Sequence, residues 1–354
     1  MQTYRCLLTG LGNIGRNFLD ILATREALLR DRYNLALQIV GVADSSGTVY
    51  APEGLNLAEV ITIKREGRGV ADLPNGQRGN SPVALTEQAA FDLLFEATPT
   101  NLRDGQPALD IVRTALRRGL PCVLASKGPL VLAYAELAAL SDLTGPGRPA
   151  LRFSGAVGGA LPTINLGRRD LAGSHITRVE AVLNGTTQVI LGLMAQGQSF
   201  PDALAAAQKM GIVEPDPSLD VDGWDAANKL VILANAVLGC PTTLADLTVT
   251  GISEVSSDQL QAAHAAGGRV SLLGIAEALP STSATTERPY RLSIAPTTLL
   301  ATHPLARLGL GEMGVVYTSD IAGRTTATSA EDGPLGTCAA MLRDAISIAG
   351  SPNY

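Results

Sequence analysis

The fold is decided by the stretch YRCLLTGLGNIG, which occupies residues 4–15. Its first half is a short apolar run typical of a buried strand, and its second half fits the pattern G-x-G-x-x-G. A helical pattern follows from Asn13 to about Arg30, and LALQIVGVAD (35–44) predicts a second strand. A strand, a glycine loop, a helix and another strand are typical of the start of a doubly wound α/β sheet.

Strands and helices continue to alternate after this opening. LLFEAT (93–98) and PCVLAS (121–126) predict two more strands, and ALDIVRTALRRG (108–119) predicts a helix between them. Such alternation favours a parallel, doubly wound sheet of Rossmann type. We therefore predict a dinucleotide-binding domain over residues 1–145.

The sequence changes in character after the turn-rich segment SDLTGPGRP (141–149). ITRVEAVLNG, YRLSIAPTTL and GVVYTSDIAGRTTA alternate in hydropathy as strands do, and helical patterns occur at 201–210 and 224–238. These features predict a second domain over residues 146–332, of α+β type with a mostly antiparallel sheet. We expect the helical tail, residues 333–354, to pack back on the first domain.

The composition limits the classes of molecule that the protein is expected to bind. Hydrophobic residues make up 46% and charged residues 17% of the 354 residues, and the formal net charge of -6 gives no basic surface for nucleic acid. No apolar stretch is long enough to span a membrane, and the N-terminal sequence lacks the features of a secretory signal. We expect a cytoplasmic protein that acts on a small molecule. The four cysteines are far apart and predict buried free thiols.

The glycine loop predicts a binding site for a pyrophosphate. Glycines let backbone amides approach the anion at the helix N-terminus, where N–H groups and the helix dipole favour negative charge. A glycine-rich turn that only packs a helix on a strand gives the same pattern, but the flanking strands favour a dinucleotide. We assign to the cofactor Gly10, Gly12, Asn13, Ile14 and Gly15.

The choice between NAD and NADP depends on residues after the second strand. Asp44 ends that strand, where a carboxylate can accept hydrogen bonds from the adenosine ribose and favour NAD. Ser45, Ser46, Lys64 and Arg65 could instead bind a 2′-phosphate and favour NADP, unless the two cations are only a solvated pair. We expect use of both cofactors with a modest preference.

The most informative segment is an acidic loop that leads into an apolar helix, KMGIVEPDPSLDVDGWDAANK (209–229). Asp222 is placed to cap that helix, and Asp225 and Lys229 share one of its faces. A capped helix with an ordinary ion pair accounts for these acids, but it does not account for a lysine among apolar neighbours.

A lysine in such surroundings suits catalysis. When it is partly buried and held by a carboxylate, it can donate a proton beside a carbonyl group, and a cluster of acids can bind a substrate's ammonium group. Calcium binding is the chief alternative, because carboxylates offer hard oxygen ligands. The spacing, however, departs from the pattern D-x-[DN]-x-[DN]-G-x5-E.

The segment from Ala207 to Lys229 resembles the signature of the homoserine dehydrogenase family almost position by position. Four further stretches match that family in the same order: EATPTN (96–101), ASKGPL (125–130), AVGGALPTI (156–164) and LNGTTQVIL (183–191). The resemblance implies an NAD(P)-dependent oxidoreductase that interconverts L-homoserine and L-aspartate 4-semialdehyde. It also implies a place in threonine and methionine biosynthesis and a homodimer.

The resemblance implies roles for individual residues. Lys229 is similar to the family's catalytic lysine at the reacting oxygen, and Asp225 to its partner. Lys127 is similar to a second lysine that faces the substrate and the nicotinamide. Substrate binding is implied for Glu214, which would bind the amino group, and for Asp220, Gly185 and Thr186. Further cofactor contacts are implied for Thr98, Pro99 and Gly333.

Three positions depart from the family pattern. Ser126 stands where many relatives have asparagine, and Gly336 begins a different start to the tail helix. Ser154 stands where relatives often carry a glutamate that helps to bind a sodium ion. Backbone carbonyls remain for a monovalent cation, although the charged ligand is lost: those of Val157, Gly159 and Leu161.

Two other interpretations stay open. The chain could be another NAD(P)-dependent amino-acid or semialdehyde dehydrogenase, or a non-catalytic protein that senses dinucleotides. Retention of both Lys127 and Lys229 argues against the second. Relatives that respond to threonine often carry a further C-terminal domain, and this sequence ends soon after the tail helix, so we expect little feedback inhibition at a separate site.

Overall fold

A computed structural model describes residues 1–213, 216–280, 290–330 and 333–350. The chain divides into two compact units. One comprises Met1–Ala160 together with Asp332–Tyr354, and the other comprises Leu161–Glu331.

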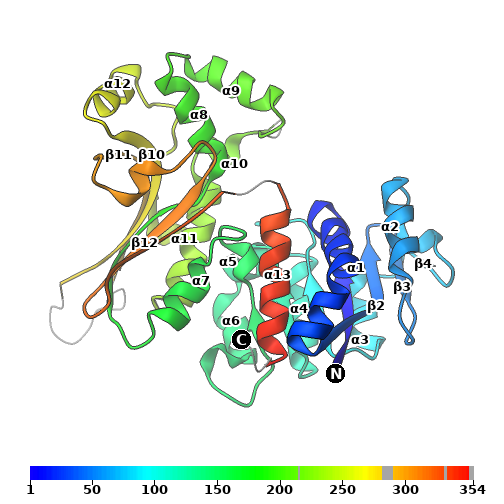
Figure 1. Ribbon diagram of the computed structural model, residues 1–354. Coiled ribbons are helices and arrows are strands. Elements are labelled where there is room, and N and C mark those ends of the chain that lie inside the picture. The colour runs from blue at the N-terminus through cyan, green and yellow to red at the C-terminus, as the bar shows by residue number, and fades with distance from the viewer. Residues whose placement is uncertain (214–215, 281–289, 331–332, 351–354) are drawn as a thin grey trace. The chain divides into compact units, whose positions relative to one another are not determined.

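The first unit is built on a seven-stranded sheet in the order β4-β3-β2-β1-β5-β6-β7 (Figure 1). Its strands are β1 (Gln2–Thr9), β2 (Leu35–Asp44), β3 (Gly47–Tyr50), β4 (Gln77–Arg78), β5 (Leu93–Glu96), β6 (Cys122–Leu124) and β7 (Leu151–Arg152). From β2 through β1, β5 and β6 to β7, all neighbours are parallel. The predicted Rossmann-type sheet is therefore confirmed. An antiparallel extension, β3 and β4, follows β2 and was not predicted.

The core of this unit lies where helices cover the apolar central strands. Phe18 of the first helix packs on Phe95 of β5 with ring centroids 4.7 Å apart. The last helix contacts the first one and adds Cys338 and Met341 to the same core, as Figure 1 shows for α1 and α13. The helices are α1 (Asn13–Tyr33), α2 (Leu57–Arg65), α3 (Pro82–Gln88), α4 (Ala108–Arg117), α5 (Gly128–Leu132), α6 (Tyr134–Leu140) and α13 (Leu335–Ile348).

The second unit contains a six-stranded sheet in the order β13-β12-β8-β10-β11-β9. The strands are β8 (Ile176–Val182), β9 (Leu247–Val249), β10 (Arg269–Ala278), β11 (Tyr290–Leu299), β12 (Met313–Ser319) and β13 (Gly323–Ser329). Every pair of neighbours is antiparallel except β9 and β11. The prediction of a mostly antiparallel second sheet is confirmed.

Helix α11 is the central helix of the second unit. Its residues from Leu230 to Ala234 are fully buried, as expected of a helix that is apolar all round. It packs on β10 and β11, and so fixes the position of the polar residues in its first two turns. The helices of this unit are α7 (Thr163–Asn165), α8 (Gly185–Ala195), α9 (Phe200–Lys209), α10 (Ser218–Val221), α11 (Trp224–Ala236) and α12 (Ser257–Ala265).

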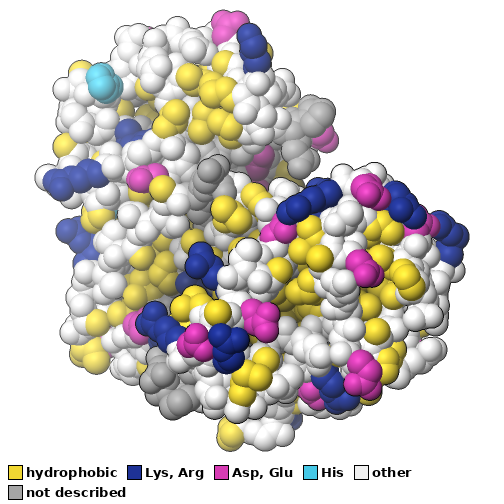
Figure 2. Space-filling model, turned by 45° about the vertical axis from the view of Figure 1, so that its right-hand side comes forward, with side chains coloured by type: hydrophobic (Ala, Val, Ile, Leu, Met, Phe, Trp, Pro, Cys, Tyr) yellow, Lys and Arg dark blue, Asp and Glu magenta, His cyan; other side chains and the backbone are white. Residues whose placement is uncertain are grey.

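The cysteines lie in the interior, and charged residues of both signs lie at the surface (Figure 2). All four cysteines are free and buried, as predicted. No helix in the described part of the chain combines the length and the apolarity that a membrane span requires. On the face shown in Figure 2, Lys and Arg side chains lie among Asp and Glu side chains and form no continuous basic surface.

Candidate active site

The glycine loop joins β1 to α1, and close contacts fix its shape. Gly10 has a φ of +87°, and a Cβ there would lie 2.4 Å from the backbone of Ala97. A Cβ on Gly15 would lie 1.9 Å from the carbonyl oxygen of Gly10. A Cβ on Gly12 would meet nothing within 4 Å, so the space above it is open. These residues fit a pyrophosphate, which can approach the backbone at Gly12 and the helix N-terminus at Asn13.

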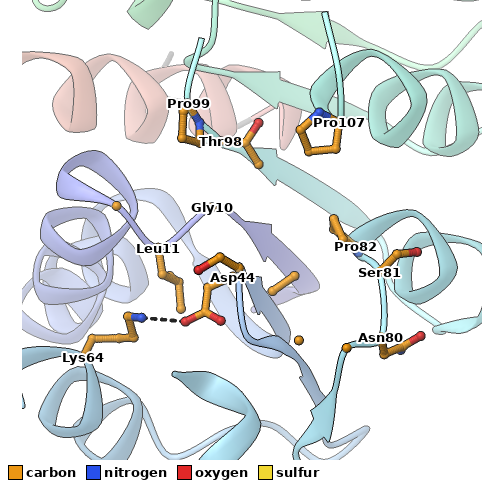
Figure 3. A pocket seen from close by; sticks show the side chains of 15 residues that line it. Gly10, Leu11, Asp44, Lys64, Asn80, Ser81, Pro82, Thr98, Pro99 and Pro107 are labelled. Carbon is orange, nitrogen blue, oxygen red and sulfur yellow. Dashed lines mark hydrogen bonds and ion pairs between the residues drawn. The ribbon is translucent and has the colours of Figure 1, made fainter. Parts of the chain in front are cut away.

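A cavity of about 530 Å³ opens beside this loop (Figure 3). Six of the residues predicted to bind the cofactor line it: Gly10, Gly12, Asp44, Lys64, Thr98 and Pro99. The other five predicted cofactor residues are not among its lining residues: Asn13, Ile14, Gly15, Lys127 and Gly333. Of these, Asn13, Ile14 and Gly15 form the first turn of α1, Lys127 precedes α5, and Gly333 precedes α13.

The wall of the cavity between β4 and α3 was missed from the sequence. It consists of Gly79, Asn80, Ser81 and Pro82, and Figure 3 shows the last three on the opposite side from Lys64. Ser81 caps α3 by accepting a hydrogen bond from a backbone N–H, and Pro82 follows at the first helical position. Serine before proline is a recognisable helix start. Its place beside the glycine loop depends on the β3–β4 extension, which the sequence did not reveal.

Asp44 at the end of β2 is fully hydrogen-bonded. Its Oδ1 accepts from the backbone N and Oγ of Ser46 at 2.8 and 2.6 Å. Its Oδ2 accepts from Lys64 Nζ at 2.5 Å and from Val70 N at 3.2 Å. Burial alone would raise the pKa of Asp44, but these hydrogen bonds outweigh it, with Lys64 foremost, and lower the pKa. Asp44 is therefore an ionised carboxylate whose charge is balanced by Lys64.

Lys64 and Arg65, the two cationic residues that could bind a 2′-phosphate, lie in different surroundings. Lys64 lines the cavity, and its side chain is only 15% exposed. Arg65 is 69% exposed, pairs with Asp20 of α1 at 2.8 Å and is not a lining residue. Lys64 alone of this pair is placed to meet the adenosine end of a dinucleotide.

A buried carboxylate joins the ends of β5 and β6. Glu96 accepts hydrogen bonds from the backbone N of Thr98 at 2.7 Å, from the Thr98 hydroxyl and from the Ser126 hydroxyl. Burial raises the pKa of Glu96, and these hydrogen bonds oppose the rise. Glu96 thus fixes Thr98 in the cavity wall and the residue before Lys127. In the sequence, Glu96 lies within the predicted strand LLFEAT and begins the matching stretch EATPTN, but no role was assigned to it.

In the second unit, Asp225 and Lys229 lie one turn apart on α11. Lys229 Nζ is 2.8 Å from Asp225 Oδ2 and donates to the carbonyl oxygen of Leu183 at 2.6 Å. The two side chains are 12% and 9% exposed. The pair is therefore a largely desolvated ion pair, and the lysine also donates one hydrogen bond to a backbone carbonyl.

One of the remaining substrate-binding candidates is linked to this pair by hydrogen bonds. Asp220 is linked to Asp225 through Asn184, which donates to both carboxylates. Gly185 and Thr186 begin α8, whose first backbone N–H groups have no partners within the helix. Glu214 lies outside the described residues.

Asp222 does not cap α11, contrary to expectation. The N-cap is Gly223, in the left-handed conformation at a φ of +87°, and Asp222 instead ends the short helix α10. The tight turn between the two helices requires this conformation, which glycine adopts at little cost.

The turn proposed for a monovalent cation carries a cationic side chain. The Ser154 hydroxyl donates to Asp344 of α13 at 2.7 Å, and the neighbouring Arg343 donates to the carbonyl oxygen of Ala160 at 3.5 Å. A guanidinium against this turn disfavours a second cation by like-charge repulsion. No step of the reaction proposed below involves a metal cation. Within the described ranges, no group of three or more His, Cys, Asp or Glu side chains is placed to hold a metal ion.

Comparisons with known proteins cover the whole chain. The family model for homoserine dehydrogenase matches residues 162–346, and that for glutamate/leucine/phenylalanine/valine dehydrogenase matches residues 1–103. The chain is 34% identical to the NAD(+)-dependent homoserine dehydrogenase of Pseudomonas canavaninivorans, over 98% of this chain and 97% of that one. It is 32% identical to the homoserine dehydrogenase of Methanocaldococcus jannaschii, over 98% of each.

A solved structure gives the same result for the fold. The crystal structure of homoserine dehydrogenase from Thermoplasma acidophilum matches with a TM-score of 0.80 and 26% identity, over 99% of this chain and 100% of that one.

Proposed function

Since this chain belongs to the homoserine dehydrogenase family, we propose that it catalyses reversible hydride transfer between L-homoserine and L-aspartate 4-semialdehyde with NAD or NADP. The observation that carries the proposal is the desolvated pair of Lys229 and Asp225, which lies in the segment that matches the family signature. A purely structural ion pair gains little from such burial, because desolvation offsets the attraction of the two charges.

Lys229 is proposed to act on the oxygen of the reacting carbon. When the semialdehyde is reduced, hydride addition to its carbonyl carbon leaves an alkoxide, which needs a proton. The ammonium group is held by the ion pair with Asp225 and by its hydrogen bond to Leu183, and a remaining N–H group can donate to that oxygen. In the direction of homoserine oxidation, the same nitrogen takes the hydroxyl proton while hydride leaves the carbon.

The substrate's charged groups are proposed to bind to the surrounding residues. Asp220 and Glu214 supply carboxylates for the ammonium group. Gly185 and Thr186 offer backbone N–H groups at the N-terminus of α8, which favours the substrate carboxylate. These interactions are made before and during hydride transfer, so they set affinity more than turnover.

The dinucleotide is proposed to bind in the first unit, where its nicotinamide ring supplies or accepts the hydride. Gly12 and the first turn of α1, which contains Asn13, Ile14 and Gly15, would hold the pyrophosphate. The cavity would take the adenosine half at Asp44 and Lys64, and the residues at the end of β5 would contact the cofactor beyond it: Thr98 and Pro99. We assign further cofactor contacts to Lys127 and Gly333, and to Lys127 a role in catalysis.

We expect the enzyme to use both NAD and NADP, because Lys64 balances the negative charge of Asp44. A carboxylate at the end of β2 disfavours a 2′-phosphate, but here Lys64 balances that charge at 2.5 Å. The Pseudomonas relative is described as NAD(+)-dependent. We propose a modest preference between the two cofactors.

We further propose that the enzyme is a homodimer. The second unit exposes several large apolar side chains, among them Leu300, Leu310 and Ile321. Figure 2 shows hydrophobic side chains gathered into patches on the visible face. Contiguous apolar patches favour association. Light scattering after size-exclusion chromatography should give twice the mass of one chain, and a single-chain mass would contradict the dimer.

The reaction is proposed to serve threonine and methionine biosynthesis in the cytoplasm. Homoserine is the four-carbon precursor of both amino acids, and four buried free thiols fit a reducing compartment. A bacterial strain that lacks homoserine dehydrogenase should grow without added threonine and methionine when it expresses this chain. Failure to grow, with the protein folded and present, would contradict this placement.

The activity is tested by following nicotinamide absorbance with homoserine and either cofactor. The substrate panel should include other β- and γ-hydroxy amino acids, because a preference for one of them would identify a different dehydrogenase. Activity with homoserine that disappears in Lys229→Ala supports the proposal. A folded protein that binds the dinucleotide but turns over none of these substrates would instead indicate a dinucleotide sensor.

A further inference from the structure

We propose that Asn184 is a positioning residue that orients both active-site carboxylates and, through Asp225, the catalytic lysine. The inference rests on the proposed function, which assigns Lys229 and Asp225 to catalysis. Asn184 lies between β8 and α8, within the matching stretch LNGTTQVIL, and is separated in sequence from all three residues that it serves, so its role could not be predicted from the sequence.

The amide group of Asn184 has one possible orientation. Its Oδ1 accepts a hydrogen bond from the backbone N of Thr187 at 2.8 Å, as the N-cap of α8. Its Nδ2 must therefore face the other way. There it donates to Asp220 Oδ1 at 2.6 Å and to Asp225 Oδ2 at 2.9 Å. Both N–H groups and the oxygen of this buried amide are used.

The adjoining residue completes the arrangement. Lys229 donates to the carbonyl oxygen of Leu183 at 2.6 Å and lies 2.8 Å from the same Asp225 oxygen that Asn184 contacts. The dipeptide Leu183–Asn184 thus holds both members of the ion pair from outside α11. Asp225 cannot turn toward or away from Lys229 without breaking its bond to Asn184.

A neutral donor is the group that this position requires. Two carboxylates and one ammonium group already surround it, so a third carboxylate would be repelled. An apolar side chain would remove one hydrogen-bond donor from each carboxylate, and a hydroxyl could donate to only one of them. Asparagine supplies two donors and the helix cap together.

The test compares Asn184→Ala and Asn184→Asp with Asn235→Ala as a matched control. Asn235 lies on α11 and makes an equivalent set of bonds: its Nδ2 donates to Val231 O at 2.9 Å and Thr242 O at 2.8 Å, and its Oδ1 accepts from Thr242 N. All three partners are backbone atoms. The control therefore reports the loss of a partly buried, fully hydrogen-bonded asparagine whose hydrogen bonds do not involve the carboxylates.

Asn184→Ala should lower kcat by about 10²-fold, the effect typical of a misplaced catalytic group, and should also raise KM for homoserine. Asn235→Ala should lower Tm but leave kcat close to that of the unmodified enzyme. For Asn184→Asp, kcat relative to the unmodified enzyme should rise as the pH falls from about 8 to about 6. The neighbouring carboxylates favour protonation of the introduced carboxyl group, which can then donate one hydrogen bond.

A second measurement does not depend on turnover. The rate at which an acetylating reagent modifies Lys229, followed by peptide mass spectrometry, should increase in Asn184→Ala and stay unchanged in Asn235→Ala. If the unmodified enzyme is inactive with homoserine, the proposed function fails, and this rate still decides whether Asn184 holds the lysine. Unchanged modification in Asn184→Ala, equal losses of kcat in the two alanine variants, or a pH-independent Asn184→Asp ratio would each overturn the inference.

Discussion

Replacing Lys64 by methionine should lower kcat/KM for NADP and leave kcat/KM for NAD almost unchanged. Asp44 and Lys64 are 2.5 Å apart, so a 2′-phosphate meets both charges at similar distances and their effects nearly cancel. Methionine keeps most of the side-chain volume but removes the positive charge. The ionised carboxylate of Asp44, whose pKa lies below its usual value, then acts alone on the phosphate.

The size of the effect follows from the uncompensated charge. Even at about 8 Å and an effective dielectric constant of about 20, one carboxylate repels each unit of phosphate charge by about 2 kcal/mol. We therefore expect kcat/KM for NADP to fall by about 30-fold or more. The value for NAD should change little, because Asp44 keeps its bonds to Ser46 and Val70. The same bonds limit the loss of folding stability to about 1–3 kcal/mol.

Steady-state kinetics with both cofactors decide the matter, with Arg65→Met as the control. Arg65 is the neighbouring cation on α2, but it pairs with Asp20 outside the cavity. An NADP-to-NAD ratio that is unchanged in Lys64→Met, or that shifts equally in Arg65→Met, would refute the reasoning. A preference of the unmodified enzyme for NADP above about a thousandfold, or about 4 kcal/mol, would also show that Asp44 does not disfavour NADP.

Four further substitutions have defined outcomes. Lys229→Ala should lower kcat by about 10²-fold or more with little effect on cofactor affinity, and Asp225→Asn should resemble it; a folded alanine variant with near-normal kcat would exclude Lys229 as the proton donor. Glu214→Ala should raise KM for homoserine more than it lowers kcat, since it removes the proposed partner of the substrate's ammonium group; steady-state kinetics showing the reverse would contradict this role. Burial raises the pKa of Asp344, against the opposing hydrogen bonds from Ser154. Asp344 therefore stabilises the fold fully below the ordinary aspartate pKa of about 3.9, and this contribution is lost as the pH rises through the raised pKa of the folded protein. Asp344→Asn should flatten the dependence of Tm on pH. The same dependence of Tm on pH in the variant and in the unmodified enzyme would contradict this.

Much of the fold could be predicted because most elements show their periodicity in the sequence. The predicted strand at 35–44 coincides with β2. Strand β10, by contrast, is buried at most of its positions and shows no alternation, which hides it from pattern analysis. Strands β3 and β4 are too short to give a clear signal.

In the candidate site, contacts between residues close in the sequence could be predicted, and contacts between distant segments could not. The pairing of Asp225 and Lys229 could be anticipated because residues four apart share one helix face. The contacts of Asn184 with residues of α10 and α11 could not, because packing alone brings these segments together. The predicted start of the helix at residue 224 is correct, but its cap was assigned to Asp222 instead of Gly223, because a left-handed glycine and an acidic cap give similar sequence patterns.

Transfer of a labelled hydride tests the central claim most directly. Aspartate 4-semialdehyde would be incubated with the enzyme and a reduced nicotinamide cofactor that carries deuterium at the transferred position, and the product would be analysed by mass spectrometry. The account predicts homoserine that is one mass unit heavier, with the deuterium on the carbon that bears the hydroxyl group, and loss of this product in Lys229→Ala. Recovery of unreacted semialdehyde, or of homoserine without deuterium, from a folded enzyme that binds the cofactor would contradict it.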